Sequence, residues 1–152
     1  MTASPRTLTL DMVLACEANI SKLELGTFDA VEIPAFETLS QRKHYLNLSG
    51  LSSLSDEEAA VFAKHTGILD LSGLKELSDA AICKLAAKKG GLWLNGLTRL
   101  SDTAEEALSK HEGSLYLWGL KELRLMTDEV PSKPILSKYN IFLSWSQVKI
   151  RA

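Results

Sequence analysis

Residues 46–114 repeat one phrase three times. The copies read LNLSGLSSLSDEEAAVFAKHTGI (46–68), LDLSGLKELSDAAICKLAAKKGG (69–91) and LWLNGLTRLSDTAEEALSKHEGS (92–114), each 23 residues long without a gap. The first two copies are identical at 10 of 23 positions. A fourth copy opens at Leu115 as LYLWGLKEL and then diverges. Self-similarity at a fixed period of this kind indicates stacked repeats, so we expect one structural unit per copy.

Each copy divides into a strand part and a helix part. The opening Leu-x-Leu alternation predicts a short strand with both leucines on one side. One glycine then follows in each unit, at a turn with positive φ or at a close approach of neighbouring units. These glycines are Gly50, Gly73, Gly96 and Gly119.

A Ser-Asp pair followed by an alanine-rich stretch predicts a helix in each copy. Ser55 with Glu58, and Asp102 with Glu105, fit the spacing of a capping box. The same helical position in each copy holds a large apolar residue, which we expect to be the main inward anchor. These anchors are Phe62, Leu85 and Leu108. A second set of glycines is placed to end the helices, namely Gly67, Gly90 and Gly113.

The phrase L-x-L-x-G-L-x-x-L-S-D of residues 69–79 resembles the repeats of bacterial leucine-rich repeat proteins. The resemblance is strong over 46–123 and partial over 23–45. It implies an α/β fold: a right-handed leucine-rich-repeat solenoid with a short parallel sheet on one face and helices on the other. One departure is that leucine fills the position where this family often has Asn, Cys or Thr. These leucines are Leu51, Leu74, Leu97 and Leu120.

We expect a single domain over 1–152, consisting of an N-terminal cap (1–22), repeats (23–123) and a divergent last repeat with a C-terminal cap (124–152). The N-terminal cap is predicted to contain a helix over 11–22, and Leu23-Glu-Leu25 to open a weaker repeat. Towards the C-terminus, an insertion containing Pro131 and Pro134 delays a last strand at Ile141-Phe-Leu143. Such caps are needed because an uncovered terminal repeat exposes apolar surface and a sheet edge.

Composition excludes several classes of protein. Seventeen basic and 19 acidic residues leave a net charge of −2, which provides no global field for nucleic acid or an acidic membrane. The chain has no apolar run long enough for a membrane-spanning helix, and Asp11 interrupts the N-terminal apolar run too early for a signal peptide. We therefore expect a cytoplasmic protein with free thiols and no nucleic-acid or membrane partner.

The outward positions of the predicted strands are the candidate binding surface. They are polar in the first copies and aromatic in the later ones, where rings on adjacent strands should touch. The selected partner-binding residues are Trp93, Tyr116, Trp118, Asp70, Asn95 and Asn47. An exposed aromatic patch favours partner binding. Two alternatives remain open: cross-strand packing for stability, and coverage of the patch by the C-terminal segment.

No catalytic pattern accompanies these repeats. The sequence contains no phosphate loop, no G-x-S-x-G and no H-E-x-x-H, so we expect no catalytic residue, no metal and no cofactor. His65, Lys88 and His111 occupy one repeat position, where a basic group complements the end of a helix dipole. Cys16 and Cys83 are expected to be small packing residues.

These observations favour a non-enzymatic scaffold, monomeric alone, that binds a protein partner through the sheet face as an inhibitor, an immunity protein or an adaptor. The alternative is a structural or self-associating repeat module without a dedicated ligand. An enzyme is a remote alternative, since the fold class by itself does not define function.

Overall fold

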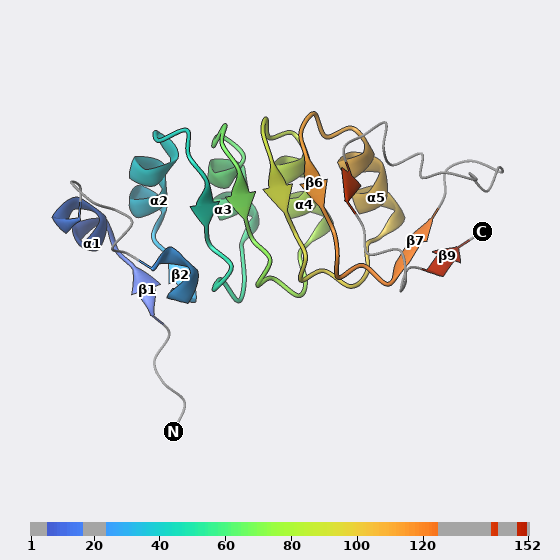
Figure 1. Ribbon diagram of the computed structural model, residues 1–152, viewed down its shortest axis with the longest axis horizontal. Helices are drawn as coiled ribbons and strands as arrows, with labels where there is room; N and C mark the ends of the chain where they lie inside the picture. The colour runs from blue at the N-terminus through green and yellow to red at the C-terminus, as the bar shows by residue number, and fades with distance from the viewer. Residues whose placement is uncertain (1–5, 17–23, 125–140, 143–148, 152) are drawn as a thin grey trace, which may run out of the picture.

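The computed structural model describes residues 6–16, 24–124, 141–142 and 149–151. β-strands and α-helices alternate from Thr7 to Tyr116, and the described elements after them are strands. Figure 1 shows the units side by side along the long axis of the molecule, with the strands in one layer and the helices in a second layer behind them. The molecule is therefore an α/β protein made of repeated strand–helix units.

The main sheet has five short parallel strands in chain order. They are β3 (Leu46–Asn47), β4 (Leu69–Asp70), β5 (Leu92–Trp93), β6 (Leu115–Tyr116) and β8 (Ile141–Phe142). The first leucine of each repeat lies opposite the first leucine of the next, and Ile141 continues this row beside Leu115. This register confirms that leucines 23 residues apart align on adjacent parallel strands.

The helix layer lies behind the sheet, one helix for each unit (Figure 1). The helices of the described residues are α1 (Leu10–Ala15), α2 (Ile33–Ser40), α3 (Asp56–Phe62), α4 (Asp79–Ala86) and α5 (Asp102–Ser109). Each helix packs against the next one in the chain. Short helices of this kind are marginal alone, so packing against the sheet must stabilise them.

Serine begins each of the three regular helices. The hydroxyls of Ser55, Ser78 and Ser101 accept a hydrogen bond from the backbone N–H three residues further on. Glu58 returns the bond by accepting from the Ser55 N–H at 2.8 Å, which confirms the predicted capping box. The box predicted for Asp102 is wrong, because Ser101 caps α5 and Asp102 is already the first helical residue.

The core fills the space between the two layers. Both leucines of every Leu-x-Leu strand from Leu46 to Leu117 are at most 3% exposed. The predicted anchors Phe62, Leu85 and Leu108 are buried beneath them. In the first units, the ring of Phe36 stacks on that of Phe62 with 3.7 Å between centroids. One continuous cluster of apolar side chains therefore joins all the units.

The leucine that follows each turn glycine satisfies the turn through its backbone. Its N–H donates to the carbonyl of the second strand leucine, at 3.1 Å from Leu51 to Leu48 and 3.2 Å from Leu97 to Leu94. Leu74 and Leu120 make the same bond. The side chains of all four leucines remain free to join the core.

The glycine after each strand is required by close packing between units. A Cβ added to Gly73 would lie 1.9 Å from the carbonyl oxygen of Ser49 in the preceding unit. The second set of glycines does not cap the helices, since the C-cap residues of α3, α4 and α5 are Ala63, Ala87 and Lys110. Gly90 is the described glycine with a positive φ, at 90°.

At the N-terminal end, β1 (Thr7–Leu8) pairs in parallel with β2 (Ala30–Val31), and the partners are 23 residues apart. The repeated arrangement thus extends one period upstream of β2 and α2. In that upstream unit, α1 occupies the place that α2 occupies in the next unit. The helix that was predicted over 11–22 begins at Leu10 and ends at Ala15. Residues 17–22 of that prediction lie outside the described part of the chain. No strand forms at Glu24 and Leu25, because the chain turns into the short 3-10 helix η2 (Leu25–Thr27).

At the C-terminal end, the strand predicted at Ile141 is present as β8. A further parallel pair joins β7 (Glu122–Arg124) to β9 (Lys149–Arg151). Of these strands, β8 and β9 lie in the C-terminal segment 124–152, and β7 ends at its first residue. The insertion with Pro131 and Pro134 lies outside the described residues. Within the described part, no helix is long and apolar enough to cross a membrane.

Candidate functional site

The outward side chains of the main sheet form one continuous surface, here called the sheet face. Because side chains alternate along a strand, the residue before each strand, the residue between its leucines and the residue after its second leucine all lie on this face. The leucines between them are buried, whereas Trp93 and Tyr116 are half-buried and Trp118 is 57% exposed. The sheet face therefore presents accessible aromatic rings above a base of buried leucines.

In the first units, the polar residues of the sheet face bond to their own backbone. Asn47 Oδ1 accepts from the Ser49 N–H at 3.0 Å and from the Ser49 hydroxyl at 2.7 Å. Asp70 Oδ1 accepts from the Ser72 N–H at 3.0 Å. Asn and Asp favour such local bonds, which hold the turn after the strand. These two candidate residues thus have a structural role.

Asn95 has a similar role between units. Its Nδ2 donates to the Ser72 hydroxyl at 3.1 Å, and its Oδ1 accepts from the Trp118 N–H at 3.0 Å. The amide therefore links three successive units, and both of its polar ends are used. Among the six predicted binding residues, Asn47, Asp70 and Asn95 are the ones tied to the fold in this way.

Tyr45 is a member of the site that the sequence prediction missed. It is 46% exposed, and its hydroxyl donates to Asp70 Oδ2 at 2.9 Å. Burial of the phenol, this hydrogen bond and the negative charge of Asp70 together raise the pKa of Tyr45 to about 12. The available signal was the strand alternation, which continues one residue ahead of Leu46 and turns Tyr45 outward.

The four aromatic residues of the sheet face form a chain of ring contacts, here called the aromatic row. Tyr45 and Trp93 have centroids 5.5 Å apart, Trp93 and Tyr116 5.0 Å, and Tyr116 and Trp118 5.9 Å. Their planes are inclined by 51–69°, within the geometry that aromatic pairs favour. The prediction that Trp93, Tyr116 and Trp118 touch is confirmed.

The members of the aromatic row differ in how far they depend on the fold. Trp93 lies between two tyrosines, and its indole N–H is buried with no hydrogen-bond partner in the described part of the chain. Packing alone therefore holds this ring. Trp118 has a ring contact on one side, with Tyr116, and is open to solvent. The backbone register also places Phe142 beside Tyr116 at the end of the sheet.

A second repeated position is basic and buried. Lys88 Nζ donates to the carbonyls of Gly67 at 2.5 Å and Lys89 at 2.7 Å, and burial lowers its pKa to about 8. In the next unit, the ring nitrogens of His111 lie 3.0 Å from the carbonyls of Ala86 and Gly90. These side chains connect successive units.

His65 makes the equivalent contacts, with its ring nitrogens 3.3 Å from the Ser40 carbonyl and 2.9 Å from that of His44. Burial lowers the pKa of His65, and its bonds to the two carbonyls oppose this effect. The helix dipole that it meets is that of the preceding helix, α2, rather than the end of its own helix. The predicted role in the last turn of its own helix is therefore wrong, because His65 lies beyond the end of α3 and contacts the preceding unit.

No other cluster in the described residues has the composition of a reactive site. They contain no group of His, Cys, Asp and Glu side chains able to hold a metal. The prediction that Cys83 is a packing residue is wrong, since it is exposed on α4, whereas Cys16 is partly buried. Neither cysteine lies beside a histidine in the contacts of the structure.

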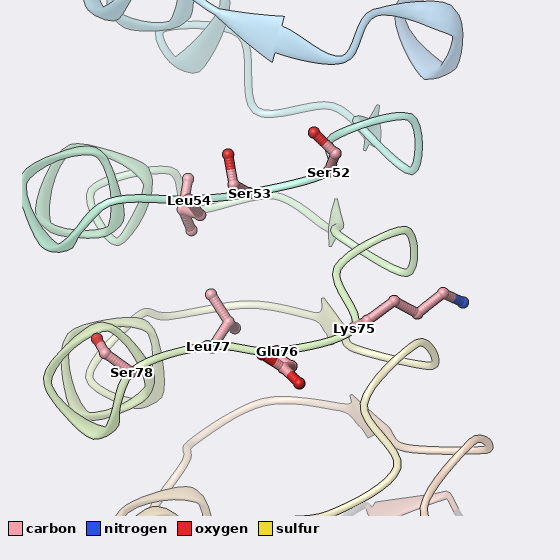
Figure 2. Close-up of a pocket in the computed structure, with 7 residues that line it drawn as sticks. All are labelled: Ser52, Ser53, Leu54, Lys75, Glu76, Leu77 and Ser78. Carbon is pink, nitrogen blue, oxygen red and sulfur yellow. The ribbon is translucent and has the colours of Figure 1, made fainter.

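A hollow of about 480 Å³ lies between the chains that lead from two neighbouring strands to their helices. Figure 2 shows its lining by Ser52, Ser53 and Leu54 on one side and by Lys75, Glu76, Leu77 and Ser78 on the other, with the Lys75 amine directed away. The Ser78 hydroxyl in this lining donates to Asp56 Oδ1 and accepts from the Ala81 N–H, so it holds the start of α4.

Comparisons of the chain with protein-family models, with curated proteins and with solved structures gave no match.

Proposed function

We propose that this protein is a non-enzymatic binding scaffold that holds a protein partner against its sheet face, centred on the aromatic row. The observation that carries the proposal is the 57% exposure of Trp118 at the end of a chain of ring contacts. Trp and Tyr are the residues most enriched among those that dominate binding energy at interfaces. A contiguous exposed aromatic patch therefore favours an interaction surface.

The base beneath the aromatic row supports this function. Rings that are already in contact, on strands in register, lose little freedom when a partner binds. Asn95 strengthens the arrangement because its side chain holds the Trp118 backbone at 3.0 Å. Binding energy would then come from ring burial with a small ordering cost.

Within this proposal, the fold is a right-handed leucine-rich-repeat solenoid, and the protein acts in the cytoplasm as a monomer that meets its partner. The parallel strands at 23-residue spacing and the helix layer behind them support this class. Preorganised repeat surfaces of this kind suit inhibitors, immunity proteins and adaptors.

Site-specific photo-crosslinking in the native host tests the proposed function. A benzophenone amino acid replaces Trp118 in one variant and Cys83, exposed on α4 in the helix layer, in a matched control. We expect a defined protein adduct from position 118 and none from position 83. Adducts from position 83 alone would refute the assignment of the sheet face. An adduct with a second copy of the chain would favour the self-associating alternative.

A further inference from the structure

The sheet face has a one-sided charge. Its outward positions on β3 to β6, from Tyr45 to Trp118, contain one acidic residue, Asp70, and no basic one. Asp70 lies beside Trp93 in the strand register. Lys75 and Lys121 come after the glycine turns and so lie outside these positions. A partner that docks here meets aromatic rings beside Asp70, which is itself 6% exposed.

Aromatic faces and carboxylates attract the same chemistry. The negative face of a Trp or Tyr ring attracts an ammonium or guanidinium group, and the attraction grows as water is displaced. Asp70 is bonded to the Tyr45 hydroxyl, and Tyr45 in turn contacts Trp93. The carboxylate and the row of rings are therefore parts of one connected surface.

The polar residues beside the rings already serve the fold. A carbohydrate ligand would have to use the donors and lone pairs that these contacts leave. Asn47 and Asp70 already bond to Ser49 and Ser72, and both ends of Asn95 are used. Cation–π and Coulomb attraction need no free lone pair, so they remain available on this surface.

We propose that the partner presents an extended basic segment, with Arg or Lys side chains lying on the aromatic row beside Asp70; this proposal rests on the proposed function. An extended chain places alternate side chains about 6.6 Å apart. The rings of the row succeed one another at 5.0–5.9 Å. Alternate basic side chains can thus reach successive rings. Arginine fits best, because its planar guanidinium stacks on aromatic faces.

The test titrates the full chain with three labelled twelve-residue peptides of alternating sequence, Arg-Ser, Gln-Ser and Glu-Ser, followed by fluorescence anisotropy. We expect saturable binding of the Arg-Ser peptide that weakens with salt, and no binding of the other two. NMR of the indole N–H of Trp118, identified with a Trp118→Phe variant, should show that signal move with the Arg-Ser peptide.

Charge-matched variants locate the site. Asp70→Asn keeps an acceptor for Ser72 and removes the charge, whereas Glu57→Gln removes an exposed charge on α3 in the helix layer. Asp70→Asn should weaken Arg-Ser binding roughly threefold to tenfold, and Glu57→Gln should leave it unchanged. Circular dichroism melting confirms that both variants fold.

Equal weakening by the two variants would overturn the proposal, since binding would then follow net charge alone. A Trp118 signal that moves with a neutral oligosaccharide and not with the Arg-Ser peptide would overturn it in favour of a sugar ligand. If no peptide binds while position 118 still crosslinks a protein, the basic segment is wrong and the proposed function survives. If position 118 crosslinks nothing, the proposed function itself fails.

Discussion

The two halves of the sheet face share one backbone and use their outward side chains differently. On β3 and β4, Asn47 and Asp70 bond to the turn that follows their own strand. On β5 and β6, Trp93 and Tyr116 contact each other across the strands. Beneath both halves lie the same buried leucines in the same register. The comparison teaches that the same outward position holds a turn when its side chain is short and polar, and joins two strands when its side chain is a ring.

The difference follows from side-chain size. A short side chain such as Asn reaches the N–H two residues further on and gains a local hydrogen bond. An indole or phenol ring extends beyond its own backbone and meets the ring on the next strand, about 4.8 Å away. Asn47 and Asp70 therefore stabilise the turns that follow them, and Asp70 and Asn95 also bond to neighbouring units. The rings build a surface that spans several units.

The prediction with the largest expected effect tests whether the buried leucines stabilise the two halves of the sheet face equally. Leu71 lies beneath the polar half and Leu94 beneath the aromatic half, and both leucines are fully buried. The variants are Leu71→Ala and Leu94→Ala. Each change should lower the free energy of unfolding by about 2–5 kcal/mol, because it leaves a cavity in a packed core. Urea unfolding measures this, with Leu14→Ala, 46% exposed on α1, as the control. A much smaller loss for Leu94→Ala would mean that the later units do not stack in solution.

The next effect tests the structural role of the polar half. Asp70→Ala removes the acceptor of the Ser72 N–H and of the Tyr45 hydroxyl at a residue that is 6% exposed. We expect a loss of about 1–3 kcal/mol, the cost of a buried donor without a partner. Asp70→Asn, which keeps an acceptor for Ser72, should lose clearly less in the same unfolding experiment. Equal losses would assign the role of Asp70 to its charge.

A smaller effect should separate the rings within the aromatic row. Trp93→Ser removes two ring contacts and should cost about 1–3 kcal/mol. Trp118→Ser removes an exposed ring and should change the free energy of unfolding by less than about 0.5 kcal/mol while abolishing partner binding. Thermal melting and copurification of the crosslinked partner measure the two properties. If Trp118→Ser were as destabilising as Trp93→Ser, the aromatic row would serve to stabilise the fold by cross-strand packing.

The smallest effect at neutral pH concerns Tyr45, which joins the two halves. Its pKa is raised to about 12, whereas the unfolded phenol loses its proton near the ordinary value of 10.0. Between these values Tyr45 binds more protons in the folded chain than in the unfolded one, so its contribution to stability is constant below pH 10 and falls as the pH rises towards 12. The phenolate absorbance difference between the wild type and Tyr45→Phe measures the titration.

The bond between Tyr45 and Asp70 can be checked in the same titration. Asp70→Asn should move the Tyr45 midpoint back towards its ordinary value, because both the charge and the carboxylate acceptor are lost. A midpoint near pH 10 in the wild type would contradict the contact.

Much of the fold was predictable because its signals are local. The Leu-x-Leu alternation located β3 to β6, and the Ser-Asp pairs located the start of α3, α4 and α5. The wrong predictions concern places where one sequence pattern is compatible with two local structures. Ser101 and Asp102 both can cap a helix, and the serine did so. Leu23-Glu-Leu25 has the strand alternation, yet the chain turns at Leu25.

The candidate site was predicted in part. The strand period placed Trp93, Tyr116 and Trp118 together, and it missed Tyr45, which stands outside the repeated phrase. The hydrogen bonds of Asn47, Asp70 and Asn95 could not be predicted, because the same outward position serves a turn or a ligand equally well. Exposure and existing partners decide between these roles, and both depend on neighbouring units.

The amino-acid sequence by itself determined the unit, its length of 23 residues, the buried leucines and the order of the strands. These features follow from periodicity, because a residue repeated at one interval must occupy one place in a stacked array. Only the tertiary structure decided which outward residues are tied to the fold and which are open. Tyr45 contacts Asp70 and Trp93, 25 and 48 residues away, across the strands of other units. Such contacts depend on how the units meet, and periodicity alone does not specify them.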